Sequence, residues 1–313
     1  MSQRKGMLVA MPERWDEACF SVSALRALIR TGMLGGLVCR EEQSAFWKTV
    51  CNLPQFCFSE KTKLASLIGQ IQGDWDASLA WAPGFAAKAF AKAGIKRRLG
   101  TSDPAMKKLL THPMAVKEGP TEHAVRLYLK TCELMGVQVD RPEFFVAASM
   151  GIPARPKSVL LCPGSDFGPS HEWPLDRWHE LAESLLEMGK NITVAGSAGG
   201  RGLGKILAGR LGTTAEFLHV APLATALPLL AAHQLVISAD GSLPHLAAHA
   251  GSTCVTLFGP NDAVWKRPLG KRHVIVKRHV ECAPCLSEKC LMDNRCQNEL
   301  EVNRVIAALP ECF

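Results

Sequence analysis

The chain has 313 residues, of which 47% are hydrophobic and 21% charged, so its composition is that of a folded globular protein and excludes intrinsic disorder. Its length suits two domains rather than a single core. Basic residues outnumber acidic ones, and the net charge of +7 favours an anionic partner such as a phosphate-rich glycan, a nucleotide or a nucleic acid.

The sequence contains no run of about 18 apolar residues, so we expect no membrane-spanning helix. Residues 1–6 are polar and lead directly into a short apolar segment, without the longer apolar stretch and small-residue cleavage site of a secretory signal. We therefore expect a cytoplasmic protein, in which most cysteines stay reduced and pack as small apolar side chains.

Apolar segments of strand length alternate with segments of helical periodicity, more regularly in the second half of the chain. In the first half the pattern predicts strands at residues 7–11, 37–39 and 77–81 and helices at 23–30 and 85–93. In the second half it predicts strands at 158–162, 192–195, 234–239 and 254–258 and helices between Pro174 and Gly189 and at 205–211, 223–232 and 244–250. Because strands joined by helices of this length form right-handed crossovers, we expect doubly wound parallel sheets.

A proline-containing stretch at residues 136–157 is the expected hinge between two domains. We therefore predict an α/β protein with a Rossmann-like N-terminal lobe at 1–150, a Rossmann-like C-terminal lobe at 151–313 and a cleft between them. In open parallel sheets ligands bind beyond the carboxyl ends of the strands, so the loops that follow the strands are the first places to search for a site.

The loop after the strand at 158–162 is the first candidate site. A Pro-Gly pair, a Gly-Pro pair and a Trp-Pro pair that opens the next helix leave backbone N–H groups free at a helix N-terminus. Such groups and the helix dipole suit a phosphate or diphosphate, although an ordinary strand-to-helix turn can have the same composition. The candidate phosphate contacts are Pro163, Gly164, Ser165 and Gly168.

The loop after the strand at 234–239 is the second candidate site. Asp240, Gly241, Ser242 and His245 surround the start of a helix there. Gly241 and Ser242 would let a ligand approach the backbone closely. Taken singly, Asp240 suits a helix N-cap and His245 a buried core histidine, but the two in one turn at the end of a strand favour a binding site.

Three ordered motifs resemble the signature of glycosyltransferase family 9. They are Pro-Gly-x-x-x-Gly-Pro-x-x-x-Trp-Pro from Pro163, Asp-Gly-Ser-Leu-Pro-His from Asp240, and Leu-Phe-Gly-Pro ending at Pro260. The similarity extends over nearly the whole chain and is greatest to the heptosyltransferase II branch of the ADP-heptose:lipopolysaccharide heptosyltransferases. It implies a GT-B type fold, in which the C-terminal lobe holds an ADP-sugar and the N-terminal lobe presents the acceptor.

The resemblance also implies a reaction. An inverting transferase of this family moves a heptose or a related sugar from ADP-heptose to a lipopolysaccharide core or similar envelope glycan, and a carboxylate after the first strand deprotonates the acceptor hydroxyl. Loop amides and helix N-termini stabilise the leaving diphosphate, so no metal or other cofactor is required. The implied partners are a nucleotide sugar and an anionic lipid-linked acceptor, which would place a cytoplasmic enzyme peripherally at the inner membrane surface.

The carboxylate position departs from the family pattern. Counting back from the first helix puts Glu17 where the family carries Asp, and Asp16 where it carries Gly. The longer arm of Glu moves the oxygen by about 1 Å, which lowers the rate unless the acceptor shifts as well. We take Glu17 as the candidate base and Asp16 as its alternative, although both acids would also favour a helix N-terminus without a catalytic role.

Two further departures affect the nucleotide side. The family's phosphate-facing Lys is His171 here, which can still donate a hydrogen bond to phosphate. The loop at 196–204, with the candidate contacts Gly196 and Ser197, lacks the acidic residues that can hold the ribose in the family. Together with Glu17, these changes leave open a catalytically impaired relative that binds a nucleotide sugar without transfer.

Basic side chains gather in one part of the first lobe, and the candidate contacts to the acceptor's anionic groups are Lys88, Lys92, Arg97 and Arg98. Each of these charges would also suit a solvated helix face. We expect no nucleic-acid partner, because no recognisable nucleic-acid-binding motif accompanies the charge. Aromatic residues make up 6% of the chain and include one tyrosine, so no aromatic platform for a sugar is evident.

Two further patterns resemble nucleotide or metal sites, but each lacks a feature that such a site needs. Residues 199–205 fit the frame of a phosphate-binding NTPase loop, but Ile206 replaces the hydroxyl residue that binds magnesium. Asp74 and Asp76 form an Asp-x-Asp pattern, but they precede a strand of the first lobe, where capping acids are common. We assign no catalytic metal to either pattern.

Four cysteines near the C-terminus have the spacing Cys-x2-Cys-x4-Cys-x5-Cys, and they are Cys282, Cys285, Cys290 and Cys296. Four thiolates could hold a structural zinc ion in tetrahedral geometry. The spacing is tighter than in the usual zinc knuckles, so packed thiols without a metal are the alternative.

Overall fold

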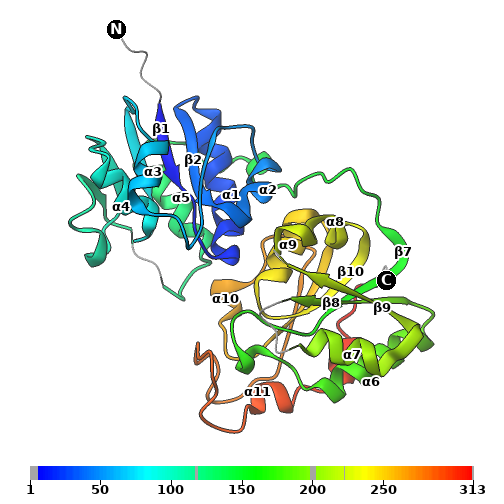
Figure 1. Ribbon diagram of the computed structural model, residues 1–313. Coiled ribbons are helices and arrows are strands. Elements are labelled where there is room, and N and C mark those ends of the chain that lie inside the picture. Colours follow the sequence, from blue (N-terminus) through cyan, green and yellow to red (C-terminus); the bar gives the residue numbers. More distant parts are fainter. Residues whose placement is uncertain (1–5, 117–118, 198–201, 222, 312–313) are drawn as a thin grey trace. The chain divides into compact units, whose positions relative to one another are not determined.

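The computed structural model describes residues 6–116, 119–197, 202–221 and 223–311. The chain divides into two compact units, Met1–Val146 and Ala147–Phe313, so the boundary falls slightly before the expected position at residue 150. Each unit is built around a parallel sheet with helices on both sides (Figure 1). Among the described residues, no helix is long and apolar enough to cross a membrane.

The described residues of the first unit contain a six-stranded parallel sheet with the order β3-β2-β1-β4-β5-β6. Its central strand, β1, pairs Val9 with Leu37 of β2 on one side and with Leu79 of β4 on the other. The strands are β1 (Met7–Ala10), β2 (Leu34–Arg40), β3 (Gln55–Phe58), β4 (Ala77–Ala80), β5 (Arg98–Thr101) and β6 (His112–Met114).

Helices cover this sheet in two groups. The helices α3 and α4 share one apolar core with side chains of β1 and β2, whereas α1 packs against α5. The helices are α1 (Trp15–Arg30), α2 (Ser44–Lys48), α3 (Leu64–Gln70), α4 (Phe85–Lys92) and α5 (Val125–Leu134). The first unit is thus a doubly wound sheet of the kind that the alternating pattern predicts.

The first helix, α1, begins at Trp15 rather than at the expected residue 23. Its first half is buried almost all round, including Ala18, Phe20 and Val22, so it lacks the polar stripe that marks an amphipathic helix in a sequence. As a consequence Asp16 and Glu17 both lie in the first turn of α1.

The described residues of the second unit repeat the same topology, with a parallel sheet in the order β12-β11-β10-β7-β8-β9. In the centre, Ile237 of β10 pairs with Leu161 of β7 and with Val255 of β11. The strands are β7 (Arg155–Cys162), β8 (Asn191–Ser197), β9 (Ala215–Val220), β10 (His233–Ala239), β11 (Thr253–Phe258) and β12 (Val274–Lys277).

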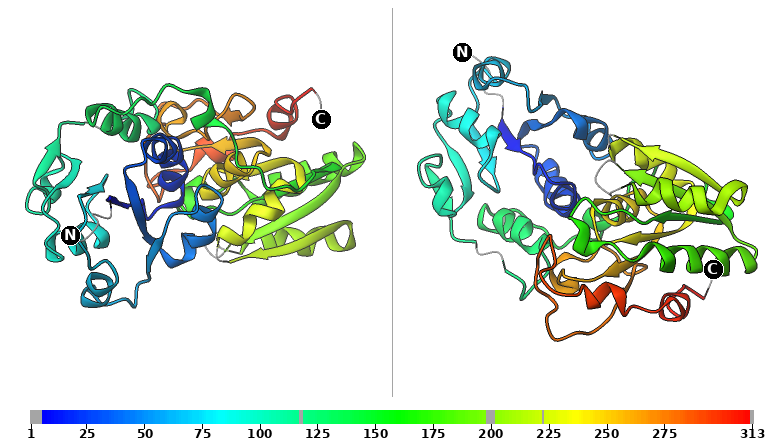
Figure 2. Two further views of the ribbon diagram at one scale, coloured as in Figure 1. Left: turned by 90° about the horizontal axis from the view of Figure 1, so that it is seen from above. Right: turned by 60° about the horizontal axis from the view of Figure 1, so that its bottom comes forward.

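In the second unit α6, α7 and α12 share one apolar core with the sheet, and α8 packs against α9 (Figure 2). Trp178 of α6 lies within that core, fully buried against the ring of Trp173. The helices are α6 (Leu175–Glu187), α7 (Leu203–Leu211), α8 (Ala226–Ala231), α9 (Ser242–Ala250), α10 (Ala263–Lys266), α11 (Arg295–Asn298) and α12 (Val302–Ile306).

The side chain of His273, just before β12, makes the stability of the second unit depend on pH. Burial, with a smaller effect of the positive charge of Arg272, lowers the pKa of His273 to about 4. An unfolded histidine titrates near about 6.5, so between these values only the unfolded chain binds the proton. The contribution of His273 to the free energy of unfolding is therefore most favourable above about pH 6.5, and it decreases as the pH falls toward 4.

We therefore expect the Tm to fall between pH 6.5 and 4, and His273→Gln to make that fall shallower. Differential scanning calorimetry across this range measures the effect. His279→Gln, which changes an exposed histidine of the same unit, is the control. Equal pH slopes for the His273 variant and the unmodified protein would contradict the assignment.

Candidate functional site

Each sheet reverses its strand order at one point, and open parallel sheets bind ligands beyond the carboxyl ends of the strands at such points. The point lies between β1 and β4 in the first unit and between β7 and β10 in the second. The loops that follow these strands begin at Met11, Trp81, Pro163 and Asp240. Both loops that the sequence singles out, after β7 and after β10, therefore lie at the switch point of the second sheet.

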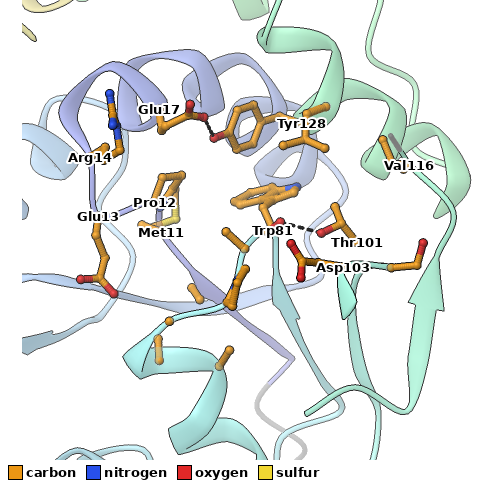
Figure 3. A pocket seen from close by; sticks show the side chains of 18 residues that line it. Met11, Pro12, Glu13, Arg14, Glu17, Trp81, Thr101, Asp103, Val116 and Tyr128 are labelled. Atoms are coloured by element: carbon orange, nitrogen blue, oxygen red, sulfur yellow. Dashed lines mark hydrogen bonds between the residues drawn. The ribbon is translucent and has the colours of Figure 1, made fainter. Parts of the chain in front are cut away.

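A cavity of about 420 Å³ opens at the switch point of the first sheet. Small-molecule sites have volumes of about 300–1,000 Å³, so a sugar-sized ligand fits. Residues that follow β1, β4 and β5 line the cavity together with side chains of α1 and α5 (Figure 3). This cavity is the candidate substrate site of the first unit.

The two carboxylates proposed as bases lie in different surroundings, because successive residues of a helix point about 100° apart. Glu17 lines the cavity. Asp16 is fully buried and accepts a hydrogen bond from Nε of Arg14 at 3.2 Å. Of these two acids, the geometry therefore favours Glu17 as the one that a substrate in the cavity would meet.

Two aromatic side chains at the cavity were not expected from the sequence. Trp81 directly follows β4, and Tyr128 comes from the middle of α5. The hydroxyl of Tyr128 donates a hydrogen bond to Oε2 of Glu17. The rings of Trp81 and Tyr128 meet edge to face, with their centroids 5.3 Å apart. Figure 3 shows Glu17 and Tyr128 pointing toward one another on the same side of Trp81. A large side chain directly after a buried strand is the signal that could have identified Trp81.

The basic residues proposed for the acceptor do not gather at this cavity. Lys88 and Lys92 are exposed on α4. Arg97 lines a different cavity, which includes Met7 at the amino end of β1. The guanidinium of Arg98 donates to the carbonyl oxygens of Leu109 at 2.7 Å and Ile95 at 2.5 Å, so it holds the start of β5.

In the second unit, two loops meet in a buried hydrogen-bond network. Nδ1 of His171 lies 2.9 Å from Oδ2 of Asp240, and the two side chains are 4% and 0% exposed. Ser165 Oγ donates to the carbonyl oxygen of Asp240 at 2.5 Å. The structure thus joins three of the predicted nucleotide-site residues, and His171 is engaged with Asp240 inside the protein rather than with solvent.

The amino end of α9 is occupied by a carboxylate that the sequence did not single out. Asp166 accepts hydrogen bonds from the backbone N of Ser242 at 2.8 Å and from its hydroxyl at 2.5 Å. A Cβ at Gly241 would lie 2.8 Å from Oδ1 of Asp166, so any other residue there would displace the carboxylate. An incoming diphosphate would meet a negative charge at α9, whereas α6 has no side-chain hydrogen bond at its N-cap, Pro174.

The segment that carries the four cysteines crosses the loop after β7. Gly168 has a φ of +112°, and a Cβ there would lie 2.5 Å from the carbonyl oxygen of Glu288. Ser170 Oγ donates to the carbonyl oxygen of Ser287 at 2.5 Å. The backbone N of Leu286 donates to the carbonyl oxygen of Pro260 at 2.8 Å. Residues 286–288 therefore connect the loops after β7 and β11.

We expect Gly168→Ala to lower the free energy of unfolding by about 1–3 kcal/mol, because the alanine would combine an unfavourable φ with a backbone clash. Gly189→Ala is the matched control, since Gly189 has a φ of +72° and nothing within 4 Å of the added carbon. Urea unfolding followed by fluorescence measures both. Equal losses for the two variants would show that the contact with Glu288 contributes nothing.

The four cysteines differ in exposure. Cys282 and Cys285 are exposed, Cys290 is half-buried and Cys296 is buried. Burial, followed by the charges of the other three thiols, raises the pKa of Cys296 to about 11. Among the described residues, however, no three His, Cys, Asp or Glu side chains are placed to hold a metal ion. The structural zinc site stays a prediction.

The other residues and patterns singled out in the sequence lie in packed parts of the protein or outside its described residues. His245 is 1% exposed within α9. Trp75, between the two acids of the Asp-x-Asp pattern, is buried and donates to the carbonyl oxygen of Ile71 at 2.8 Å. A Cβ at Gly196 would lie 2.7 Å from the ring of Phe217. Residues 198–201, which include the start of the NTPase-like pattern, and the side chain of Ser197 lie outside the described part of the chain.

Known proteins share both sequence and fold with this chain. The model of glycosyltransferase family 9 (heptosyltransferase) matches residues 117–295, more than half of the chain. Lipopolysaccharide heptosyltransferase 2 of Escherichia coli (strain K12) is 28% identical over 124 residues, which are 38% of this chain and 36% of that protein. Lipopolysaccharide heptosyltransferase 1 of Pseudomonas aeruginosa is 34% identical over 142 residues, which are 44% of this chain and 38% of that protein. The matches thus span little more than a third of either relative.

The solved structure of the E. coli ADP-heptose LPS heptosyltransferase II has a similar fold. It superposes with a TM-score of 0.76 over 97% of this chain and 97% of its own, at 18% identity. At this identity the likeness concerns the fold alone. The expected fold class, two Rossmann-like lobes of the GT-B type, is confirmed.

Proposed function

Because the chain belongs to glycosyltransferase family 9, the heptosyltransferase family, we propose that it moves a heptose or a related sugar from ADP-heptose to a lipopolysaccharide core or similar envelope glycan. One observation carries the proposal: the carboxylate of Glu17 lines a cavity at the switch point of the first sheet. A carboxylate placed there can remove a proton from a hydroxyl group bound in the cavity.

In the proposed reaction an acceptor hydroxyl binds beside Glu17. Its oxygen attacks the anomeric carbon of the donor sugar while its proton passes to the carboxylate, and the bond from that carbon to the diphosphate breaks. The new carbon–oxygen bond forms opposite the leaving group, so the configuration at the anomeric carbon inverts. A single displacement of this kind needs one basic carboxylate, and that is the role proposed for Glu17.

The ADP part of the donor is assigned to the second unit, at the loops after β7 and β10. Backbone amides near Gly164 and the amino end of α6 would stabilise the charge on the leaving diphosphate. The buried pair of His171 and Asp240 would fix the position of one loop relative to the other. Since protein groups supply this stabilisation, we expect transfer to continue in the presence of EDTA.

The acceptor is proposed to be anionic and linked to a lipid, at the cytoplasmic face of the inner membrane. Lys88, Lys92 and Arg97 are exposed and would be attracted to its phosphates or to anionic lipid around it. Because these side chains do not line the Glu17 cavity, they would orient the acceptor or the membrane surface rather than contact the reacting hydroxyl.

Release of free ADP from ADP-heptose, in the presence of a lipid-linked glycan extract, tests this function. We expect turnover with ADP-heptose to exceed that with UDP- and GDP-sugars offered in parallel. If no donor is turned over while ADP still binds, the chain is a catalytically impaired relative. The burial of His171 against Asp240 and the carboxylate of Asp166 at α9 are the observations that favour this alternative.

A further inference from the structure

We propose that Tyr128 is a positioning residue, which holds the carboxylate of Glu17 in the orientation that accepts the proton of the acceptor hydroxyl. The inference rests on the proposed role of Glu17 as the base. Its basis is a direct contact: the Tyr128 hydroxyl donates a hydrogen bond to Oε2 of Glu17, and both side chains line the same cavity. The two residues come from α5 and α1, helices that pack against each other.

Tyr128 is itself held firmly. Its side chain is 2% exposed, and its ring meets the ring of Trp81 at an interplanar angle of 72°. Trp81 is fixed in turn, since the hydroxyl of Thr101 donates to its carbonyl oxygen at 2.7 Å. A tyrosine has two side-chain torsions and a rigid ring, so packing of the ring determines where the hydroxyl lies. The phenol is therefore a fixed donor at the edge of the cavity.

Glu17 needs such a partner more than an aspartate would. A glutamate has one more rotatable bond, so its carboxylate is less restricted by the backbone and samples more positions. A hydrogen bond from a fixed donor to one carboxylate oxygen removes most of this freedom, so the carboxylate keeps one orientation in the cavity. Tyr128 thereby offsets the longer side chain that distinguishes Glu17 from the Asp of the family pattern.

The test removes only the hydroxyl, with Tyr128→Phe. We expect kcat for sugar transfer to fall about 10- to 100-fold, because a base displaced by about 1 Å loses reactive geometry. The KM for ADP-heptose and the Tm should stay close to those of the unmodified protein. Thr131→Val is the matched control: it deletes another buried hydroxyl of α5, which bonds to the carbonyl oxygen of Leu127 at 2.6 Å, and Thr131 itself does not line the cavity.

A double-mutant cycle with Glu17→Gln separates positioning from a structural role. If Tyr128 acts through the Glu17 carboxylate, Tyr128→Phe causes no further loss in the Glu17→Gln background. The same fold-loss in both backgrounds, or wild-type kcat in Tyr128→Phe alone, overturns the inference while leaving Glu17 as the base. If the unmodified protein turns over no nucleotide sugar, or Glu17→Gln retains full activity, the proposed function or its base fails and this inference fails with it.

Discussion

Glu17→Gln is expected to lower the rate of sugar transfer by about 10²- to 10⁴-fold, the contribution typical of a general base. The amide keeps the size of the side chain but cannot take the proton of the acceptor hydroxyl. Binding of ADP should be unchanged, because the nucleotide is assigned to the other unit. The initial rate of ADP release at saturating acceptor measures the effect.

Asp16→Asn is the control for this prediction. The carboxylate of Asp16 is fully buried and bonded to Arg14, so its loss should lower the Tm rather than the activity of the folded protein. The reverse result, with activity lost in Asp16→Asn and retained in Glu17→Gln, would move the base by one residue. It would also contradict the view that a base must line the cavity.

Asp240→Ala is expected to have the largest effect in the second unit. It removes the partner of His171 and leaves that buried ring without its hydrogen bond at 2.9 Å. The loss should lower the free energy of unfolding by about 1–3 kcal/mol, the usual result of leaving a buried polar group unsatisfied. Because the loops after β7 and β10 lose the buried side-chain bond between His171 and Asp240, the Kd for ADP should rise about tenfold or more, which corresponds to about 1.4 kcal/mol.

Chemical denaturation and isothermal titration calorimetry measure the two parts of this prediction. Asp176→Ala is the matched control, since Asp176 in the first turn of α6 is 87% exposed and pairs with Arg210 at the surface. Its effect on unfolding should stay within about 0.5 kcal/mol. If Asp240→Ala destabilises the protein but leaves the Kd for ADP unchanged, the pair is structural and the nucleotide binds elsewhere.

The central strands of both sheets were predictable, and the edge strands were not. The predicted strands correspond to β1, β2 and β4 in the first unit and to β7, β8, β10 and β11 in the second. Among the described residues all four edge strands, β3, β6, β9 and β12, were missed, and so was β5, which lies between β4 and the edge strand β6. A central parallel strand is covered on both faces and appears as a continuous apolar run, whereas an edge strand is partly exposed. The β6 segment His-Pro-Met shows this, with two of its residues exposed.

The nucleotide side of the candidate site was recognisable because its residues follow strands directly. Asp240 and the Pro163-Gly164 pair come immediately after β10 and β7, where topology alone directs a ligand. What could not be foreseen was how these loops use their side chains. Asp166 caps α9 and Asp240 pairs with His171, contacts between residues about 70 positions apart, which local patterns do not encode.

The first unit shows the limit of local patterns more clearly. Asp16 and Glu17 are adjacent acids in the first turn of α1, and which of them faces the cavity depends on how that helix is placed. Tyr128 lies 111 residues from Glu17 and shares no motif with it, so only the packing of α5 on α1 brings the pair together. Arg98 shows the opposite error, in which a local pattern predicts a function that the structure does not support. Its charge suggested a contact with the acceptor, but its guanidinium donates hydrogen bonds to backbone carbonyl oxygens.

Transfer of labelled heptose from ADP-heptose to a lipid-linked acceptor is the direct test of the proposed transferase function and of Glu17 as its base. The protein and its Glu17→Gln variant would be incubated with the labelled donor, and label in the lipid fraction would be measured over time. We expect steady incorporation by the unmodified protein and almost none by the variant. Equal incorporation by both would contradict the assignment of the base, and no incorporation by either, with ADP still bound, would contradict the transferase function itself.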